Sequence, residues 1–208
     1  MFSKILKRHS RIAVDTPTHA IFLLPGRNIS ADTMMQNFNS LIDIQKLVFY
    51  CLEPEVEWYP MPNGIDNQSD AIEGLHDNLP IIRNSIKELI AAENIPISNT
   101  ILIGFSAGGV VALGLACNFD DEYNLVISHS GAILEPGALK PCAVKTKFFL
   151  FHREDDYCFD WHERYLPMKN ALISQGYNVL FTERGFGNHT IYKNDVEEIQ
   201  HFISQEVF

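Results

Sequence analysis

The sequence lacks the long apolar stretches that membrane insertion requires. No apolar run approaches the ~18 residues that a membrane span needs, and none of signal-peptide length follows the basic amino-terminal segment MFSKILKRHSR. Cysteine is also scarce: the four residues Cys51, Cys117, Cys142 and Cys158 form neither a CxxC pair nor a metal-binding spacing. We therefore expect free thiols, no integral membrane association and a cytoplasmic protein.

Cationic residues are few. The 16 Lys and Arg residues are outnumbered by 26 Asp and Glu residues, which gives a formal net charge of -10. Nucleic acids and anionic membrane surfaces are both held by clusters of Lys and Arg, so we expect neither as a partner. A G-x-G-x-x-G phosphate-binding motif is absent as well, and we expect no cofactor and no metal.

The chain has neither a low-complexity tract nor an internal repeat. Its 208 residues fit one α/β domain spanning 1–208, with residues 1–18 as a short lead-in. Short apolar runs alternate with longer periodic ones, which is typical of a mostly parallel central sheet with helices on both faces. The expected strands are His19–Leu24, Leu47–Leu52, Thr100–Phe105, Leu125–Ser128, Lys147–Phe151 and Val179–Thr182. The expected helices are Asp32–Ile44, Ser69–Glu93 with a kink or break at Pro80, Gly108–Cys117, Trp161–Gln175 and Lys193–Glu206.

The segment Gly104–Gly108 reads GFSAG and matches the G-x-S-x-G motif. Between a buried strand and an apolar helix, this motif places a serine at a sharp turn, where the flanking glycines avoid steric crowding. Ser106 is therefore the candidate nucleophile. The backbone N–H of Ala107 would point at a reacting carbonyl oxygen, close to the positive end of the helix.

A serine nucleophile needs a histidine base and an acid that orients it. His189 lies in the loop GFGNHT after the last expected strand, and it is our choice for the base. The acid should lie between the serine and the histidine. The segment after Lys147–Phe151 offers four acids, which the residues alone do not separate: Glu154, Asp155, Asp156 and Asp160.

From His19 to Phe202, the chain resembles the phospholipase/carboxylesterase family of α/β-hydrolases. The matching segments are LLPGR, GFSAGG, FHREDD and GNHT. The resemblance implies an α/β-hydrolase fold, and it places the acid on Asp156 and the base on His189. It also implies that the backbone N–H of Arg27 is the second oxyanion donor.

The sequence departs from the family pattern at several positions. Pro25 replaces a histidine, Arg153 replaces a glycine, and Ala107 replaces a glutamine. The last change is compatible with activity because the oxyanion donor is a backbone N–H. The side chain of Arg27 is unusual at its position; it either reaches an anionic part of a substrate or lies in a solvated loop. Tyr157-Cys158-Phe159 stands in place of a proline-containing segment, which implies a different wall of the acyl site.

These features predict a serine hydrolase that cleaves carboxylic esters of small or acyl-chain substrates by a Ser-His-Asp triad. The alternatives are a lysophospholipase or acyl thioesterase on the same scaffold, and a non-catalytic binding protein, because a fold does not fix a function. The oligomeric state stays open, with a homodimer among the options. Four aromatic residues in expected loops are candidates for the substrate pocket: Trp58, Tyr59, Phe159 and Phe186.

Overall fold

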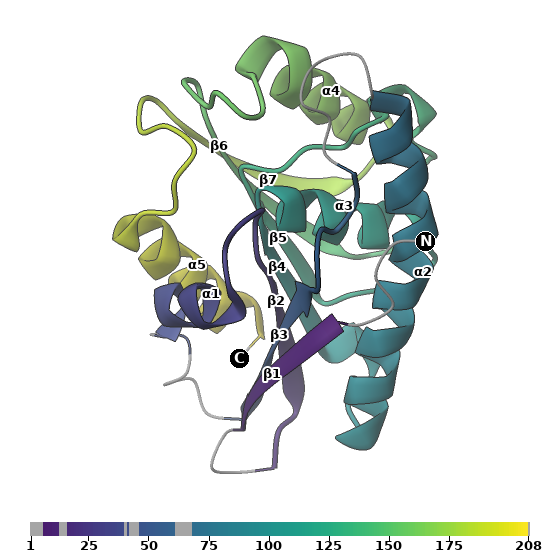
Figure 1. Ribbon diagram of the computed structural model, residues 1–208, viewed down its shortest axis with the longest axis vertical. Helices are drawn as coiled ribbons and strands as arrows, with labels where there is room; N and C mark the ends of the chain where they lie inside the picture. Colours follow the sequence, from purple (N-terminus) through teal and green to yellow (C-terminus); the bar gives the residue numbers. More distant parts are fainter. Residues whose placement is uncertain (1–5, 13–15, 40, 42–45, 61–67, 208) are drawn as a thin grey trace.

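The computed structural model of the chain describes residues 6–12, 16–39, 41, 46–60 and 68–207. Its strands form one seven-stranded sheet in the order β1-β3-β2-β4-β5-β6-β7 (Figure 1). All neighbouring pairs are parallel except β1 and β3. The predicted mostly parallel sheet is therefore confirmed. The strands are β1 (Leu6–Ile12), β2 (His19–Leu24), β3 (Leu47–Pro54), β4 (Thr100–Phe105), β5 (Leu125–His129), β6 (Lys147–Arg153) and β7 (Asn178–Arg184).

Helices cover both faces of the sheet, with α1 and α5 on one side and α2, α3 and α4 on the other (Figure 1). The central strands are buried on both faces, which is why their sequences are almost continuously apolar. In β2, Ile21 and Leu23 belong to the apolar layer under α1 and α5, whereas Phe22 and Leu24 belong to the opposite layer. The helices are α1 (Ala31–Asn37), α2 (Gln68–Ala92), α3 (Ala107–Asn118), α4 (Leu166–Ser174) and α5 (Lys193–Val207).

The amino-terminal segment differs from the expected lead-in. Residues Leu6–Ile12 form β1, which pairs antiparallel with β3 at the edge of the sheet. Its sequence, LKRHSRI, has no apolar run because an edge strand has one neighbour and tolerates charged residues. The hydrophobic pattern that revealed the buried strands therefore gave no signal here.

Three expected helices have different bounds or a different form. α2 runs unbroken through Pro80, which lies on its exposed face while Leu79 and Ile82 stay in the core. The expected helix from Trp161 begins as a π-helical turn, Trp161–Tyr165, before α4. α1 ends at Asn37, and residues 40 and 42–44 of the expected helix lie outside the described residues. The Ser30 side chain caps α1 by accepting a hydrogen bond from the N–H of Thr33.

Candidate active site

Ser106 lies at the sharp turn between β4 and α3. Its backbone has φ 54° and ψ −121°, a left-handed conformation that a serine seldom adopts and that marks local strain. A Cβ atom on Gly104 would lie 2.2 Å from the carbonyl oxygen of Gly108, and one on Gly108 would lie 1.9 Å from that of Leu24. Both positions therefore require glycine, which is the steric reason for the G-x-S-x-G spacing.

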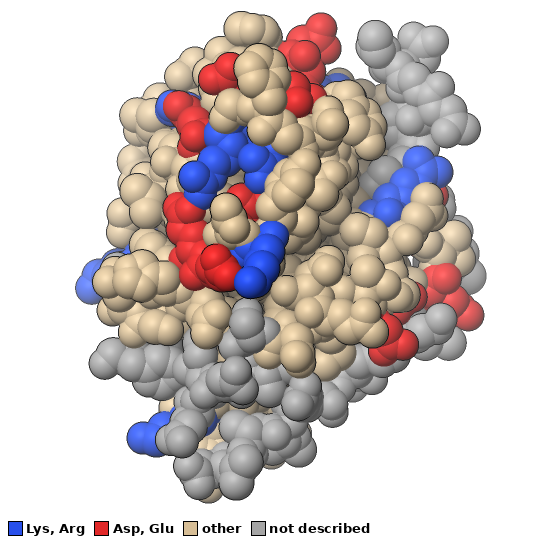
Figure 2. Space-filling view, turned by 90° about the vertical axis from the view of Figure 1, so that its left-hand side faces the viewer, with Lys and Arg blue, Asp and Glu red and all other residues tan. Residues whose placement is uncertain are grey.

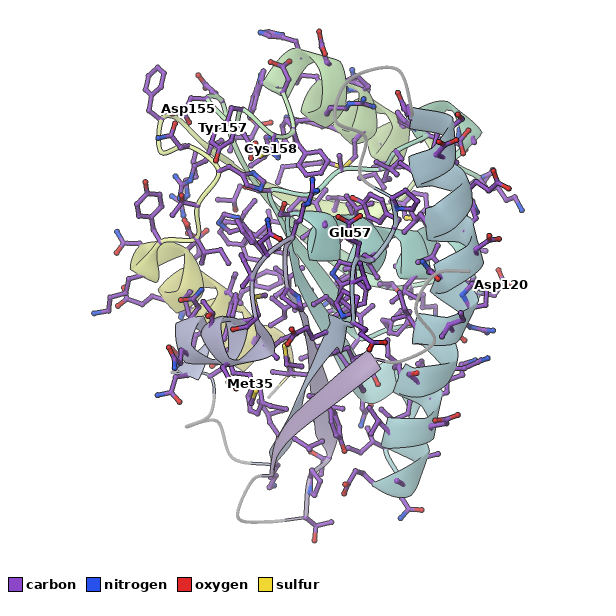
Figure 3. All side chains as sticks on the ribbon, in the orientation of Figure 1. Met35, Glu57, Asp120, Asp155, Tyr157 and Cys158 are labelled. Carbon is purple, nitrogen blue, oxygen red and sulfur yellow. The ribbon has the colours of Figure 1, made fainter. Side chains whose placement is uncertain are left out.

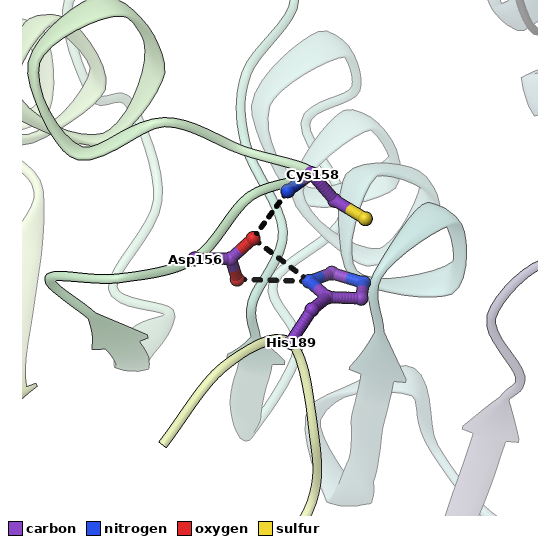
Figure 4. A group of neighbouring side chains, drawn as sticks. All are labelled: Asp156, Cys158 and His189. Carbon is purple, nitrogen blue, oxygen red and sulfur yellow. Dashed lines mark hydrogen bonds and ion pairs between the residues drawn. The ribbon is translucent and has the colours of Figure 1, made fainter. Parts of the chain in front are cut away.

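Asp156 and His189 come together from the segments that follow β6 and β7 (Figure 4). The Nδ1 atom of His189 lies 2.9 Å from Oδ1 and 2.8 Å from Oδ2 of Asp156. The Asp156 side chain is fully buried and that of His189 is 8% exposed. The backbone N–H groups of Cys158 and Phe159 also donate to Asp156 Oδ1, each at 2.9 Å, so the carboxylate is fixed in place.

The surroundings of Asp156 favour its ionised form. Burial alone would raise the pKa of this carboxyl, but the hydrogen bonds from His189 and from the Phe159 N–H outweigh burial, so the pKa is lowered. An ionised Asp156 accepts a hydrogen bond from the Nδ1–H group of His189. The neutral imidazole then carries its lone pair on Nε2.

The His189 ring lies beside the serine turn. Its centroid is 5.0 Å from that of Phe105, the residue that precedes Ser106. The Nε2 atom of His189 is buried and has no hydrogen-bond partner among the described residues. Ser106 is itself 8% exposed. A proton acceptor and a hydroxyl are thus held in the same buried region.

The other acids after β6 have different partners. Asp155 accepts hydrogen bonds from the N–H groups of Gly187 and Asn188 at 3.0 and 2.9 Å. Asp160 caps the π-helical turn through the N–H groups of its second and third following residues, and Glu154 is exposed. Of the four candidate acids, the structure places Asp156 against the imidazole.

The turn after β2 lies next to the serine. A Cβ atom on Gly26 would lie 3.0 Å from the Cβ of Ser106, and the Trp58 indole N–H donates to the carbonyl oxygen of Pro25 at 2.7 Å. The Gly26–Arg27 peptide is therefore fixed beside Ser106. Ala107 begins α3, so its N–H has no acceptor within that helix. The Arg27 side chain is 43% exposed and pairs with Glu57 at 3.2 Å.

The four aromatic candidates for the pocket have different environments. Trp58 lines a cavity of about 270 Å³ beside Gly26 and Arg27, whose wall also carries Glu53, Glu55 and Glu57. Tyr59 is 3% exposed and belongs to the apolar core. The ring of Phe159 lies 6.0 Å from that of His189. Phe186 is 86% exposed on the loop that carries His189.

A larger cavity of about 470 Å³ lies between α2, α3 and the segment that follows β5. Its wall is mainly apolar and includes Leu79, Val110 and Leu113. Val110 is one turn along α3 from Ser106, and its N–H donates to the carbonyl oxygen of Ser106 at 3.0 Å. The helix that begins at the serine turn therefore also forms part of this cavity.

One group of possible metal ligands is found among the described residues. Donor atoms of Asp156, Cys158 and His189 lie within 4.8 Å of one another (Figure 4). However, the Asp156 oxygens already accept hydrogen bonds from two backbone N–H groups and from the imidazole. These three donors occupy most of the about four lone-pair sites of the carboxylate, so the arrangement favours an acid–base pair.

Sequence reasoning missed three buried polar residues beside this site: His129, Arg153 and Asp195. They come from the ends of β5 and β6 and the start of α5, and each is less than 8% exposed. The available signal is Arg153 itself, which replaces a glycine of the family pattern. The hydrogen bond between His129 and Asp195 joins residues 66 positions apart, which no local sequence pattern reveals.

The site lies at the carboxyl edge of the sheet. Asp155, Tyr157 and Cys158 gather there in Figure 3, while Asp120 lies on the far side beyond α2. Figure 2 shows the face that carries α1 and α5, where basic and acidic side chains lie next to each other. Within the described parts of the chain, no helix combines the length and apolarity that crossing a membrane would take.

Comparison with known proteins gives related folds. Esterase PE8 superposes with a TM-score of 0.88 at 20% identity, over 96% of this chain and 98% of that chain. The Bacillus cereus carboxylesterase superposes with a TM-score of 0.80 at 16% identity, over 97% of this chain and 95% of that chain. Zea mays acyl-protein thioesterase 2 superposes with a TM-score of 0.75 at 16% identity, over 97% of this chain and 99% of that chain. At these identities the likeness establishes the fold. No curated protein sequence matches significantly.

A family model establishes more than the fold. The model described as Phospholipase/Carboxylesterase matches residues 49–207, which is more than half of the 208 residues. The match includes the serine turn, Asp156 and His189. The solved structures that share its α/β-hydrolase fold include esterases and an acyl-protein thioesterase. The chain belongs to the phospholipase/carboxylesterase family.

Proposed function

We propose that the protein is a serine hydrolase that cleaves carboxylic esters with Ser106, His189 and Asp156. The observation that carries this proposal is the buried hydrogen bond between Asp156 and Nδ1 of His189, at 2.8 Å. It supports the proposal because the same imidazole packs against Phe105, next to a serine in a strained turn. Oriented imidazoles beside a serine hydroxyl recur on unrelated hydrolase folds.

In the proposed first step, Oγ of Ser106 attacks the carbonyl carbon of the ester. Nε2 of His189 accepts the hydroxyl proton, and Asp156 stabilises the resulting imidazolium. The negative charge that develops on the carbonyl oxygen is stabilised by the backbone N–H groups of Arg27 and Ala107. The imidazolium then returns the proton to the departing alkoxide, which leaves as an alcohol.

The second step releases the acyl group. Water enters the site, gives a proton to Nε2 of His189 and attacks the acyl carbon. The tetrahedral intermediate collapses, the ester bond to Ser106 breaks, and the imidazolium returns its proton to Oγ. The products are a carboxylic acid and the free enzyme, and neither step needs an ion or a cofactor to transfer the proton or the acyl group.

Two cavities support a substrate with an apolar acyl part and a polar leaving group. The larger cavity, of about 470 Å³, has a mainly apolar wall that is compatible with an acyl chain, and Val110, one turn after the serine, forms part of that wall. The smaller one, of about 270 Å³, is lined by Gly26 and Arg27, the turn next to the serine, and carries three glutamates. A thioester or a lysophospholipid satisfies the same description, so both remain alternatives. A binding protein without activity is a further alternative.

The four cysteines are all free thiols. This supports the proposal that the protein works in a reducing compartment, such as the cytoplasm.

The test uses the full chain with a fluorophosphonate probe and a substrate panel. Covalent labelling of the wild type and no labelling of Ser106→Ala would support a serine hydrolase. The panel compares oxygen esters, thioesters and lysophospholipids of increasing acyl length, and the highest kcat/KM identifies the class. If the folded wild type neither reacts with the probe nor hydrolyses any panel member, the proposal fails in favour of a binding protein.

A further inference from the structure

A buried group of charged side chains lies where β5, β6 and α5 meet. Oδ2 of Asp195 accepts hydrogen bonds from Nη2 of Arg153 at 2.6 Å and from Nε2 of His129 at 3.1 Å. Asp195 is 2% exposed and His129 is 1% exposed. Burying such groups costs free energy unless every charge is paired.

The contacts determine the charge state of the group. Burial alone would raise the pKa of Asp195, but the hydrogen bonds from His129, the Tyr192 N–H and Arg153 hold it at about 2. Burial lowers the pKa of His129, so the imidazole is neutral and donates through Nε2. The buried ion pair is therefore between Asp195 and Arg153, with His129 as a neutral donor. A second, partly exposed cation is more distant: Nε of Arg184 lies 4.0 Å from Oδ1 of Asp195.

Buried ion pairs are weak contributors to stability, and their best-attested use is to select one arrangement over others. The partners of this pair indicate which arrangement is selected. The N–H of Tyr192 donates to Asp195 at 2.9 Å, and the guanidinium of Arg153 lies 4.7 Å from the centre of the Tyr192 ring. Tyr192 ends the loop that begins after β7 and carries His189.

Arg153 also contacts the other side of that loop. A Cβ atom on Gly187 would lie 2.9 Å from Nη1 and 3.0 Å from Cδ of Arg153, so the loop backbone lies directly against this side chain. The Tyr192 hydroxyl donates to the carbonyl oxygen of Gly187 at 2.8 Å. Arg153 and Asp195 thus contact the loop on both sides of His189.

The third member of the group is attached to the serine turn. The carbonyl oxygen of His129 accepts the N–H of Ser106 at 2.9 Å. The His129 ring lies 5.5 Å from that of Phe105, which lies 5.0 Å from the ring of His189. The same buried group therefore contacts the segment that holds the serine and the loop that holds the imidazole.

We propose that Asp195 is a positioning residue, which uses Arg153 and His129 to hold the His189 loop at a fixed distance from the Ser106 turn. The inference rests on the proposed function. Arg153 stands where the family resemblance leads one to expect glycine. The contact of its side chain with the His189 loop is therefore a feature of this chain and not of the family pattern. Asp195 does not touch the reacting atoms; its effect passes through Tyr192 and Arg153 to the loop.

The test compares Asp195→Asn with Asp121→Asn in the full chain. Asp121 is a matched control because it is also buried and ion-paired, with Arg83 and Lys87, but lies beyond the carboxyl end of α3. We expect both variants to have a lower Tm. Asp195→Asn alone should lower kcat by about 10- to 100-fold, because small misplacements of a catalytic group have effects of this size. Its KM should change by less than about two-fold, since the cavities are untouched.

A second readout needs no turnover. The proton between Nδ1 of His189 and Asp156 should give a downfield NMR signal, assigned by its loss in His189→Gln. We expect Asp195→Asn to shift or broaden this signal and Asp121→Asn to leave it in place. Arg153→Lys, which keeps the charge, should retain more kcat than Arg153→Gly, and this pair decides the question if Asp195→Asn does not fold.

Two results would overturn the proposal. One is a normal kcat at 25 °C with an unchanged proton signal in a folded Asp195→Asn protein. The other is equal activity of Arg153→Lys, Arg153→Gly and the wild type. If the wild type hydrolyses no ester, the proposed function fails, while a proton signal that moves in Asp195→Asn still supports the positioning role.

Discussion

Asp155 and Asp156 are neighbours in the sequence, yet they support His189 in two different ways. Asp156 binds the imidazole through Nδ1 at 2.8 Å, whereas Asp155 binds the loop backbone at Gly187 and Asn188. Adjacent residues point in different directions after a strand ends, so two carboxylates reach the ring and the loop separately. This division of roles leads to a graded prediction.

Asp156→Asn should lower kcat by at least about 10³-fold, because an amide no longer stabilises the imidazolium or its tautomer. Asp155→Asn should have a smaller effect, through loosening of the loop backbone. Asp160→Asn should affect only the helical turn that it caps. Initial rates of the three purified variants test this order. A larger loss in Asp155→Asn than in Asp156→Asn would show that Asp155, and not Asp156, is the catalytic acid.

Ser106→Ala should remove nearly all hydrolysis while leaving the fold intact. The loss should be at least about 10³-fold in kcat, because the substitution deletes the attacking oxygen and residual catalysis comes from the oxyanion donors alone. Serine and alanine both carry a Cβ, so the backbone strain at φ 54° is the same in the variant, and the Tm should not change by more than a few degrees. Retention of more than about a tenth of the wild-type kcat would remove Ser106 from the mechanism.

Gly108→Ala should destabilise the protein strongly. The added Cβ would lie 1.9 Å from the carbonyl oxygen of Leu24, a backbone atom that cannot move without displacing β2. We expect a loss of at least about 3 kcal/mol in the free energy of unfolding. Gly137→Ala is the matched control, because a Cβ there meets nothing within 4 Å. Chemical denaturation of both variants measures the difference, and equal midpoints would contradict the steric argument.

Acidification should destabilise the fold through His152. Its side chain donates from Nε2 to the carbonyl oxygen of Phe159 at 2.7 Å and stacks on Tyr165. Burial lowers the pKa of His152 in the folded protein. The unfolded chain, with a histidine pKa of about 6.5, then binds more protons below that pH, so stability rises with pH through this window and falls on acidification.

His152→Gln should flatten the dependence of Tm on pH between the unfolded-state value of about 6.5 and the lower pKa of the folded state. His201→Gln, at an exposed position of α5, is the control, and its dependence of Tm on pH should equal that of the wild type. His129 contributes with the same sign, because burial lowers its pKa as well. An identical profile in His152→Gln and the wild type would show that His152 is not the titrating group.

The sequence by itself determined the central strands and the serine turn. Continuous apolar runs such as His19–Leu24 are local signals of strands buried on both faces. The glycines around Ser106 are a local signal as well, because their cause is a clash within one turn and with the adjoining strand. The order of serine, acid and histidine along the chain limited the choice of the other two residues.

The tertiary structure decided what depends on distant partners. The residues alone do not separate the four acids after β6; the family resemblance pointed to Asp156, and the folded loops place its carboxylate against His189. β1 carries no apolar run, and its pairing with β3 depends on the position of the sheet edge. The contact of Asp195 with His129 spans 66 residues. Its physical basis is the burial of a carboxylate among donors from other elements, and no pattern within α5 contains that information.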